Sequence, residues 1–243
     1  MDQQQKNCSS MKNKKKYHLR NIITFLFKNK KINIFDAGAH KGDFIKKIGK
    51  KRVKRAILVD PLDFKITKKK QFKKYRFLNC LLGEKNTKKN FFVYSNKNPE
   101  WSSVNKIHKQ SPYYKLYKNR LSKVIKNKIL NQKTIDNILV NNPFKIDLLK
   151  VDCQSQTLEV LMGAKKTISS KNLKVVVCAI NSTNFYYKKK DHIDKICKFL
   201  KKYKYNFYSI VNAHSGEIGK IDFDFKNFQI WTFDAVFLKD EKI

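Results

Sequence analysis

A glycine turn after a short apolar segment is the feature that most constrains what this chain can fold into. Residues 32–35 predict a buried strand, residues 36–42 (Asp-Ala-Gly-Ala-His-Lys-Gly) predict a tight turn, and residues 44–48 carry apolar side chains at helical spacing. Glycine lets the backbone approach a ligand closely, and the start of a helix presents free N–H groups. The order strand, turn, helix therefore suits a nucleotide-like ligand.

The spacing of the two glycines argues against a dinucleotide-binding fold. Gly38 and Gly42 stand four residues apart, with His40 where the G-x-G-x-x-G pattern would place its middle glycine. Asp36, at the strand end, can accept hydrogen bonds from a ligand amine or from the N–H groups of the turn. On this stretch alone, an ordinary strand-to-helix turn of an α/β domain is an equal alternative.

Two later apolar segments also end in an acidic residue. Residues 55–59 precede Asp60, and residues 145–151 precede Asp152. Continuous apolar segments are typical of parallel strands that are covered on both faces. The carboxyl ends of such strands meet in one crevice of a doubly wound sheet, so we expect Asp36, Asp60 and Asp152 to lie together. A lone aspartate at a strand end is more often a helix cap, but three at these positions favour a shared site.

The remaining segments predict an α/β protein. Strands alternate with helices and a hairpin closes the chain, which predicts a doubly wound, mostly parallel sheet of about seven strands. Further strands are expected at 75–82, 90–95, 173–180, 206–211 and 230–238, and helices at 19–27, 64–74, 113–129, 157–167 and 191–203.

The chain is expected to hold one domain. Residues 1–16 are polar and rich in lysine and predict a mobile basic tail, and residues 17–243 predict a single domain with a helix at 19–27 docked on its edge. The periodic spacing of apolar residues weakens at about 96–142, and we interpret this segment as an insertion over the ligand side of the sheet. Such a segment, which includes a loop at Trp101 to Val104, is where substrate specificity usually resides.

The basic charge does not by itself indicate a nucleic-acid enzyme. The formal net charge is +36, from 55 Lys and Arg against 19 Asp and Glu. However, the basic residues are mostly lysines spread from end to end, whereas a binding footprint more often concentrates arginine on one face. We therefore expect non-specific, salt-sensitive binding to polyanions and give a nucleic-acid substrate less weight.

Cysteine usage and hydropathy indicate a cytoplasmic protein. The five cysteines lie far apart, without a C-x-x-C pair or a histidine at ligand spacing, so neither a disulfide framework nor a metal site is predicted. No segment approaches the length of a membrane span, and no signal peptide is recognisable.

The motifs of the first half resemble the FkbM-type family of S-adenosylmethionine-dependent methyltransferases. That family opens with an Asp-x-Gly-Ala-Asn-x-Gly turn, which residues 36–42 match except that His40 replaces the asparagine. Its second strand ends in Glu-Pro, matched by Asp60 and Pro61, and its Leu-Asp-x-Leu segment resembles residues 135–138.

The second half carries the more specific part of the resemblance, which extends from about Ile32 to Leu238. The family signature, roughly Leu-Lys-Ile-Asp-Val-Gln-Gly-x-Glu-x-x-Val-Leu-x-Gly-Ala, resembles residues 149–164, and residues 233–237 fit its closing strand. Several ordered matches at proper intervals are more specific than any single one.

The resemblance implies a class I, Rossmann-like methyltransferase fold that binds S-adenosylmethionine. It implies that Asp60 holds the ribose hydroxyls, that Gly38 admits the methionine part, and that the methyl group leaves beside Asp152. Asp152 is the first candidate for a catalytic base and His40 a weaker one, because a histidine in this loop more often stabilises it. The implied cofactor-binding residues are Asp36, Gly38, His40, Gly42 and Asp60.

Three positions depart from the family pattern. Ser155 stands in place of glycine, and Thr157 and Ala179 each stand in place of glutamate. The chain is expected to methylate a hydroxyl of a sugar or related metabolite, so that a small molecule or glycan is the acceptor. The alternatives are a catalytically degenerate protein that binds cofactor or glycan without turnover, and a nucleic-acid methyltransferase.

Overall fold

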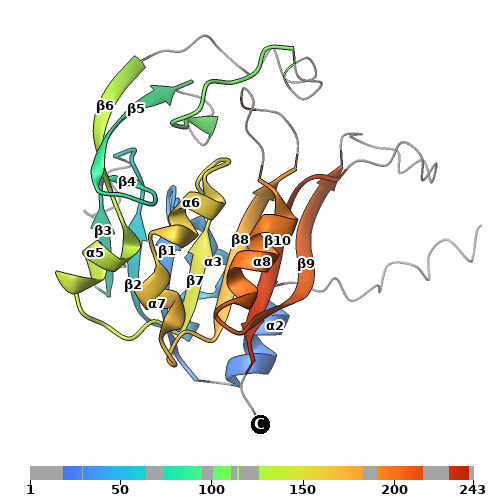
Figure 1. The fold of residues 1–243 in the computed structure, drawn as a ribbon. Helices are drawn as coiled ribbons and strands as arrows, with labels where there is room; N and C mark the ends of the chain where they lie inside the picture. Colours follow the sequence, from blue (N-terminus) through green and yellow to red (C-terminus); the bar gives the residue numbers. More distant parts are fainter. Residues whose placement is uncertain are drawn as a thin grey trace, which may run out of the picture.

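The computed structural model describes residues 19–28, 30–63, 74–94, 101–110, 114, 126–182, 186, 191–215 and 230–240. Its centre is a seven-stranded sheet with the strand order β3-β2-β1-β7-β8-β10-β9 (Figure 1). Neighbouring strands from β3 to β8 are parallel, while β10 runs antiparallel to both β8 and β9. This confirms the predicted doubly wound, mostly parallel sheet with a closing hairpin. The strands are β1 (Ile32–Ala37), β2 (Val53–Val59), β3 (Tyr75–Leu78), β7 (Leu148–Val151), β8 (Val175–Asn181), β9 (Tyr205–Ser215) and β10 (Ile230–Lys239).

Helices cover both faces of this sheet, as Figure 1 shows. One face carries α5 (Ile135–Val140), α6 (Thr157–Met162), α7 (Lys165–Ser169) and α8 (Ile193–Lys201), whose apolar side chains join one core cluster. The other carries α2 (Leu19–Phe27) and α3 (Asp43–Ile48), followed by the 3₁₀ turn η2 (Lys50–Arg52). In the described part of the chain, no helix is long and apolar enough to cross a membrane.

The alternation of side chains along each strand divides the apolar segments between the two core clusters. In β1, Ile34 joins the cluster under α2 and α3, and Phe35 joins the cluster under α5 to α8. In β7, Leu148 and Leu149 divide in the same way, and all four side chains are fully buried. Because both faces are covered, these strands are apolar throughout instead of alternating with polar residues.

A second, three-stranded sheet corrects two predictions. It has the order β4-β6-β5, with β4 (Leu81–Leu82), β5 (Thr87–Val93) and β6 (Lys126–Lys133). The strand expected at 75–82 is split, because Asn79 and Cys80 lead the chain from β3 into this sheet. The helix expected at 113–129 is wrong at 126–129, because β6 pairs with strands on both sides and this pairing overrides the apolar spacing. The rest of that range, apart from residue 114, lies outside the described residues.

Other differences concern helices. The helix expected at 157–167 is two helices, α6 and α7, separated at Gly163, where a Cβ would collide with the carbonyl oxygen of Gly83. The helix α2 packs over one face of the sheet together with α3, and not on the edge of the domain. The expected tail at 1–16 and most of the helix expected at 64–74 lie outside the described residues, as does the expected connection of the closing hairpin at 216–219. The division into tail, domain and insertion stays a prediction.

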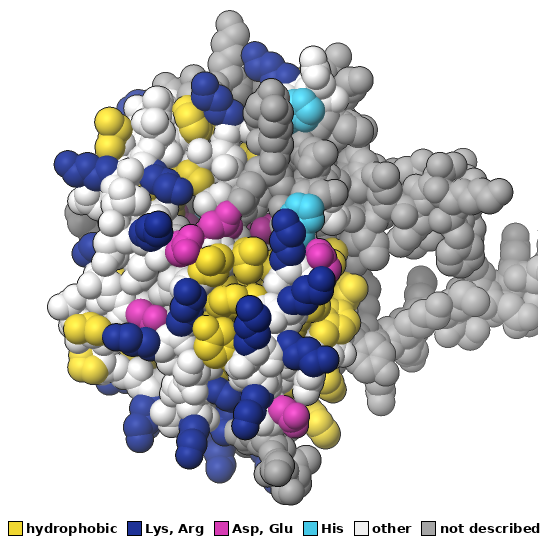
Figure 2. Space-filling view, viewed as in Figure 1, with side chains coloured by type: hydrophobic (Ala, Val, Ile, Leu, Met, Phe, Trp, Pro, Cys, Tyr) yellow, Lys and Arg dark blue, Asp and Glu magenta, His cyan; other side chains and the backbone are white. Residues whose placement is uncertain are grey.

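Charged side chains are distributed over the surface. Figure 2 shows Lys and Arg side chains spread over the visible face and not gathered in one patch, with acidic side chains among them. This distribution matches the even spread of lysines along the sequence.

Asp136 joins two of the helices that cover the sheet. Its Oδ1 accepts hydrogen bonds from the backbone N–H (2.9 Å) and the hydroxyl (2.7 Å) of Thr167, and its Oδ2 accepts one from the N–H of Lys166 (2.9 Å). Its own N–H donates to the carbonyl oxygen of Gly163 (3.1 Å). The aspartate of the Leu-Asp-x-Leu segment is therefore a structural link between α5 and the first turn of α7.

Replacing this link should destabilise the fold. We expect Asp136→Ala to lower the free energy of unfolding by about 2 kcal/mol, because three hydrogen bonds to a carboxylate are lost. Urea denaturation measures the change. Asn137→Ala, at the next position of α5, removes none of these bonds and should have a much smaller effect. Equal stabilities of the two variants would contradict the assigned role of Asp136.

Candidate functional site

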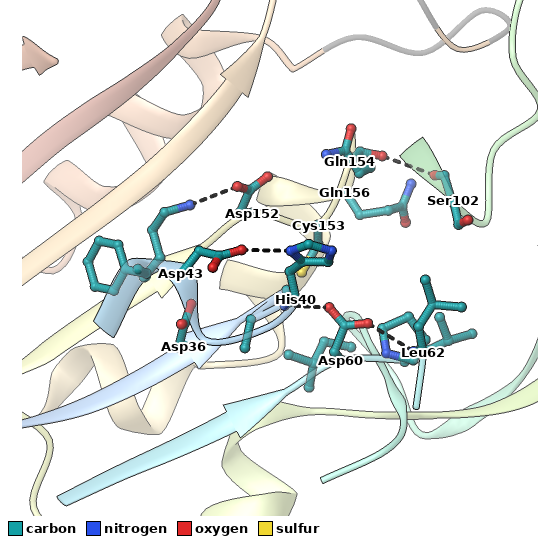
Figure 3. A pocket seen from close by; sticks show the side chains of 18 of the residues that line it. Asp36, His40, Asp43, Asp60, Leu62, Ser102, Asp152, Cys153, Gln154 and Gln156 are labelled. Atoms are coloured by element: carbon teal, nitrogen blue, oxygen red, sulfur yellow. Dashed lines mark hydrogen bonds and ion pairs between the residues drawn. The ribbon is translucent and has the colours of Figure 1, made fainter. Parts of the chain in front are cut away.

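A cavity of about 250 Å³ opens at the carboxyl ends of β1, β2 and β7. The structure brings Asp36, Asp60 and Asp152 together in its lining (Figure 3). Gly38 and His40 also line it, whereas Gly42 is not among its described lining residues. Gly42 instead has a φ of 71° and precedes the first residue of α3, so its place in the structure is the turn into this helix.

Gly38 is required by the packing of the turn itself. Its φ is 77°, and a Cβ at this position would collide with the carbonyl oxygen of Asp152. The N–H groups of Gly38 and Ala39 lie 2.9 and 3.1 Å from the carbonyl oxygen of Val59. The turn is thus held between β2 and β7, and any larger residue would push it away from β7.

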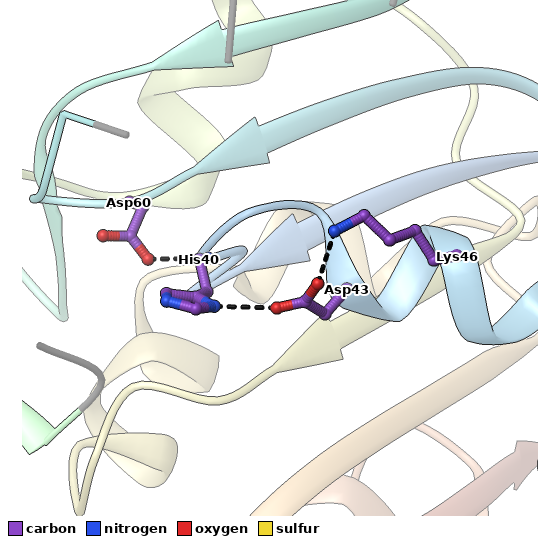
Figure 4. A network of polar contacts seen from close by, with 4 residues as sticks. All are labelled: His40, Asp43, Lys46 and Asp60. Atoms are coloured by element: carbon purple, nitrogen blue, oxygen red, sulfur yellow. Dashed lines mark hydrogen bonds and ion pairs between the residues drawn. The ribbon is translucent and has the colours of Figure 1, made fainter. Parts of the chain in front are cut away.

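His40 holds the turn in place (Figure 4). Its N–H donates to Oδ2 of Asp60 (2.8 Å), and its ring Nδ1 lies 2.7 Å from Oδ2 of Asp43. Lys46 donates to the other oxygen of Asp43 (2.6 Å). Burial alone would raise the pKa of Asp43, but these two hydrogen-bonded partners outweigh it and lower the pKa. The φ of His40 is 47°, a conformation that both asparagine and histidine tolerate. Histidine can therefore stand here in place of the asparagine of the family pattern.

Asp60 is preorganised by two backbone hydrogen bonds. Its Oδ2 accepts from His40 and its Oδ1 accepts from the N–H of Leu62 (2.9 Å). Burial raises the pKa of this carboxyl to about 6, although both hydrogen bonds act in the opposite direction. Each oxygen keeps a further lone pair for a ligand hydroxyl.

Lys150 places a buried ammonium at the centre of the site. Its Nζ lies 3.1 Å from Oδ2 of Asp152 and 3.9 Å from Oδ1 of Asp234, and its side chain is only 5% exposed. The ring centroid of Phe44 lies 5.8 Å away. Burial would lower the pKa of Lys150, but the surrounding carboxylates outweigh it and raise the pKa. The sequence patterns do not place Lys150 in the site.

Asp36 lies opposite Lys150 in the register of β1 and β7 and is 1% exposed. Its Oδ2 has no hydrogen-bond partner among the residues that the structure describes. Burial raises its pKa to about 7, and Asp152 and Asp60 act in the same direction, while Lys150 opposes them. A buried carboxylate oxygen without a partner at the wall of a cavity is available to a ligand.

Asp234 and Asn212 complete the polar wall and were also missed. The Asn212 side chain donates to Oδ2 of Asp234 (2.8 Å). A bulge makes positions 212 and 213 of β9 oppose the single residue Phe233, and Asn212 has a φ of 54°. Bulges redirect side chains beside active sites. Asp234 could have been predicted as a site residue because it is a charged residue within an apolar strand. No feature of the sequence predicts such a role for Asn212.

The loop after β7 explains one departure from the family pattern. Gln154 and Ser155 have φ values of 47° and 60°, so Ser155 adopts the conformation that the family glycine would adopt without strain. Ser155 is 1% exposed, and its hydroxyl has no partner among the described residues.

Thr157 and Ala179, the other two residues that depart from the family pattern, are in contact with each other. The hydroxyl of Thr157 donates to the carbonyl oxygen of Ala179 (2.9 Å). Asp191 also links the helix α6 to the strand β8. Its Oδ1 accepts a hydrogen bond from the N–H of Thr157 (3.3 Å), and its Oδ2 accepts one from the N–H of Asn181 (3.0 Å). Burial raises the pKa of Asp191 to about 6, against the effect of these hydrogen bonds.

Removing the side chain at Ser155 should stabilise the protein. Ser155→Gly relieves a left-handed backbone conformation and removes a buried hydroxyl without a partner, so we expect a gain of about 1 kcal/mol. Thermal or urea unfolding measures the gain. In the matched variant Ser169→Gly, within α7, the same substitution should instead lower stability by about 0.5–1 kcal/mol. A loss in both variants would contradict the strain at Ser155.

Asp36 should make stability depend on pH. Its pKa is about 7 when folded against 3.8 for an unperturbed aspartate, so the folded state binds the proton more tightly and loses stability as the pH rises from about 4 to 7. Asp36→Asn removes this loss. We expect the variant to gain roughly 2–4 kcal/mol relative to the unmodified protein over that interval. Urea unfolding of both proteins across the interval gives the difference, and parallel curves would refute the assignment.

Comparisons with known proteins agree with this architecture. The methyltransferase FkbM from Methylobacillus flagellatus superposes with a TM-score of 0.50 at 12% identity, over 85% of this chain and 43% of that one. A putative RNA methyltransferase from Pyrococcus horikoshii gives 0.46 at 12% identity, over 92% and 82%. The 1,6-didemethyltoxoflavin N1-methyltransferase from Burkholderia thailandensis, solved with 1,6-didemethyltoxoflavin and S-adenosylhomocysteine, gives a TM-score of 0.45 at 7% identity, over 98% of this chain and 84% of that one.

At 12% identity the Methylobacillus flagellatus structure is similar in fold alone, and this chain spans 43% of the length of that protein. No curated protein sequence matches the chain. The strand order and the reversed β10 are those of class I S-adenosylmethionine-dependent methyltransferases. The sequence itself matches the methyltransferase FkbM domain over residues 36–207, which is more than half of its length, and the chain therefore belongs to this methyltransferase family.

Proposed function

We propose that this chain binds S-adenosylmethionine in the cavity at the carboxyl ends of β1, β2 and β7 and methylates a hydroxyl of a sugar or related metabolite. The observation that carries the proposal is the convergence of Asp36, Asp60 and Asp152 on this cavity, with Oδ2 of Asp36 unpartnered among the described residues. S-Adenosylmethionine supplies a methyl group activated by a positively charged sulfonium. Carboxylates are the side chains that favour such a cation.

The residues present fit this cofactor. Asp60 offers two fixed oxygens to the ribose hydroxyls, and the unpartnered oxygen of Asp36 offers an acceptor to the ammonium group. Near Asp60, the cavity is bordered by Leu62, Leu81 and Phe91, which belong to one apolar cluster. Such a wall suits the adenine ring, because an aromatic base gains from leaving water.

Asp152 is the proposed base for the acceptor hydroxyl. Transfer of a methyl group to a hydroxyl oxygen releases the hydroxyl proton, which must pass to an acceptor. The Asp152 side chain is 40% exposed, and Lys150 holds its Oδ2 at 3.1 Å. We propose that Lys150 orients this carboxylate, while Oδ1 receives the proton.

The degenerate alternative rests on the absence of glutamate at Thr157 and Ala179. However, Asp191 brings a buried carboxylate to hydrogen bonds with Thr157 and Asn181, so this part of the site retains an acidic group. The nucleic-acid alternative requires cationic contacts to phosphate. Among the described residues that line the cavity, only Lys47 and Lys150 are Lys or Arg, which favours a small acceptor.

Calorimetric titration with S-adenosylmethionine and S-adenosylhomocysteine tests the proposal. We expect micromolar affinity for both, and at least tenfold weaker binding by Asp60→Asn, because one ribose-facing oxygen is lost. The control Asp63→Asn makes the same substitution at an exposed position of the same loop and should bind normally. A folded, unmodified protein that binds neither compound would sink the proposal.

A further inference from the structure

A second cavity, of about 260 Å³, adjoins the first. Residues that line both include Asp152, Asp234, Asn212 and Gln154, so the two spaces meet at the carboxylates around Lys150. The second cavity then extends along β8 and β10, past Ala179 and Thr232, to Asp191. Its position places it beside the carboxylate that we propose as the base.

The lining of the second cavity is rich in hydrogen-bond acceptors. Three carboxylates border it, together with three carboxamides, each of which carries an acceptor oxygen and a donor NH2 group. The oxygen of Gln154 already accepts a hydrogen bond from Tyr186. Among the described residues that line it, Lys47 is the one Lys or Arg, and its side chain is exposed. An anionic group would need several converging cationic side chains to offset these three carboxylates, and Lys47 alone does not supply them. The carboxylates are Asp152, Asp191 and Asp234, and the carboxamides are Gln154, Asn181 and Asn212.

Two of these carboxylates are held in place by contacts with neighbouring residues. Asp191 is anchored to the backbone of α6 and β8, and Asp234 is anchored by Asn212 at the bulge and by Lys150. Fixed acceptors select ligands by the positions of their donors, because little reorganisation is needed on binding.

Trp101 forms a further wall. The buried Tyr186 places its hydroxyl 2.9 Å from the carbonyl oxygen of Trp101 and 3.0 Å from Oε1 of Gln154. Ser103, two residues on, donates to the backbone oxygen of Gln154 (3.1 Å) and pairs with Phe92 of β5. The segment that carries Trp101 is therefore tied to both the second sheet and the loop after β7, which gives the cavity a defined aromatic border.

From this geometry we infer that the second cavity receives the methyl acceptor, and that the acceptor is an uncharged or cationic molecule rich in hydroxyl or amino donors, not a phosphate or a carboxylate. The inference rests on the proposed function for its chemistry. The ligand preference inferred for this cavity is opposite to that of the protein surface. A chain with a net charge of +36 attracts anions at long range, whereas the acceptors of this cavity favour ligands that donate hydrogen bonds.

Three probes with the same ring test the charge selectivity: methyl α-glucoside, which is neutral, glucosamine, which is cationic, and glucose 6-phosphate, which is anionic. Saturation-transfer NMR at physiological salt reports binding to the protein alone and to the protein saturated with S-adenosylhomocysteine. We expect the neutral or the cationic sugar to bind, and glucose 6-phosphate to bind at least tenfold more weakly. Tighter binding of the phosphate, or no binding of the other two, overturns the inference.

Two variants locate the binding site. Ala179→Leu and Thr232→Leu narrow the second cavity, and neither residue is among the described residues that line the first. We expect each to weaken sugar binding at least tenfold and to leave S-adenosylhomocysteine affinity unchanged, which also shows that the variant is folded. Thr87→Leu, the matched substitution at an exposed strand position, should affect neither. Unchanged sugar binding in both cavity variants overturns the assignment.

Failure of this inference is distinguishable from failure of the proposed function. If S-adenosylhomocysteine binds and the sugars do not, the acceptor site is wrong while the cofactor site stands. If S-adenosylhomocysteine does not bind, the proposed function fails, and sugar binding to the protein alone still decides whether the second cavity selects donor-rich ligands.

Discussion

The ammonium of Lys150, buried among carboxylates, is the interaction on which the site depends. It contacts Asp152, the first residue after its own strand, and Asp234 on β10, and it faces Asp36 across the β1–β7 register. A buried cation without partners would be strongly unfavourable, and so would the fully buried carboxylate of Asp36 without a cation nearby. The strands β1, β7 and β10 are thereby linked through one charge. One positive charge does not balance three negative ones, so the arrangement remains suited to a further cation.

The burial of Asp36 shows that an arrangement suited to a further cation lowers the stability of the folded protein. Its raised pKa records the cost of placing a charge where water cannot solvate it and where Lys150 compensates only in part. In the proposed function this carboxylate receives the ammonium group of S-adenosylmethionine, so it must be in place before the ligand arrives. The rest of the fold, with two core clusters of fully buried side chains on opposite faces of the sheet, supplies the stability that this carboxylate removes.

The sequence predicted the parts of the site that follow from strand geometry, because a buried parallel strand is an apolar segment and its last residue lies at the ligand edge. That reasoning located Asp36, Asp60 and Asp152. It missed Asp234 and Asn212, which meet only through a bulge between antiparallel strands, and Asp191, which reaches α6 from a distant part of the chain. It also attributed Gly38 to the ligand, whereas the contact that requires glycine is with the backbone of Asp152. Packing partners distant in sequence leave no periodic pattern, so they could not be predicted.

The departures at Thr157 and Ala179 are structurally a single change. Thr157 is fully buried and bonded to the backbone of Ala179, so neither position is independent of the other. A glutamate at 157 would bring a carboxylate beside Asp191, whose pKa is already raised by burial. A glutamate at 179 would lie opposite Asp234 in the β8–β10 register, where like charges repel. At these two positions the small residues and the nearby Asp191 fit one another through hydrogen bonds. This mutual fit favours a site rebuilt for a different acceptor over one that has lost its chemistry.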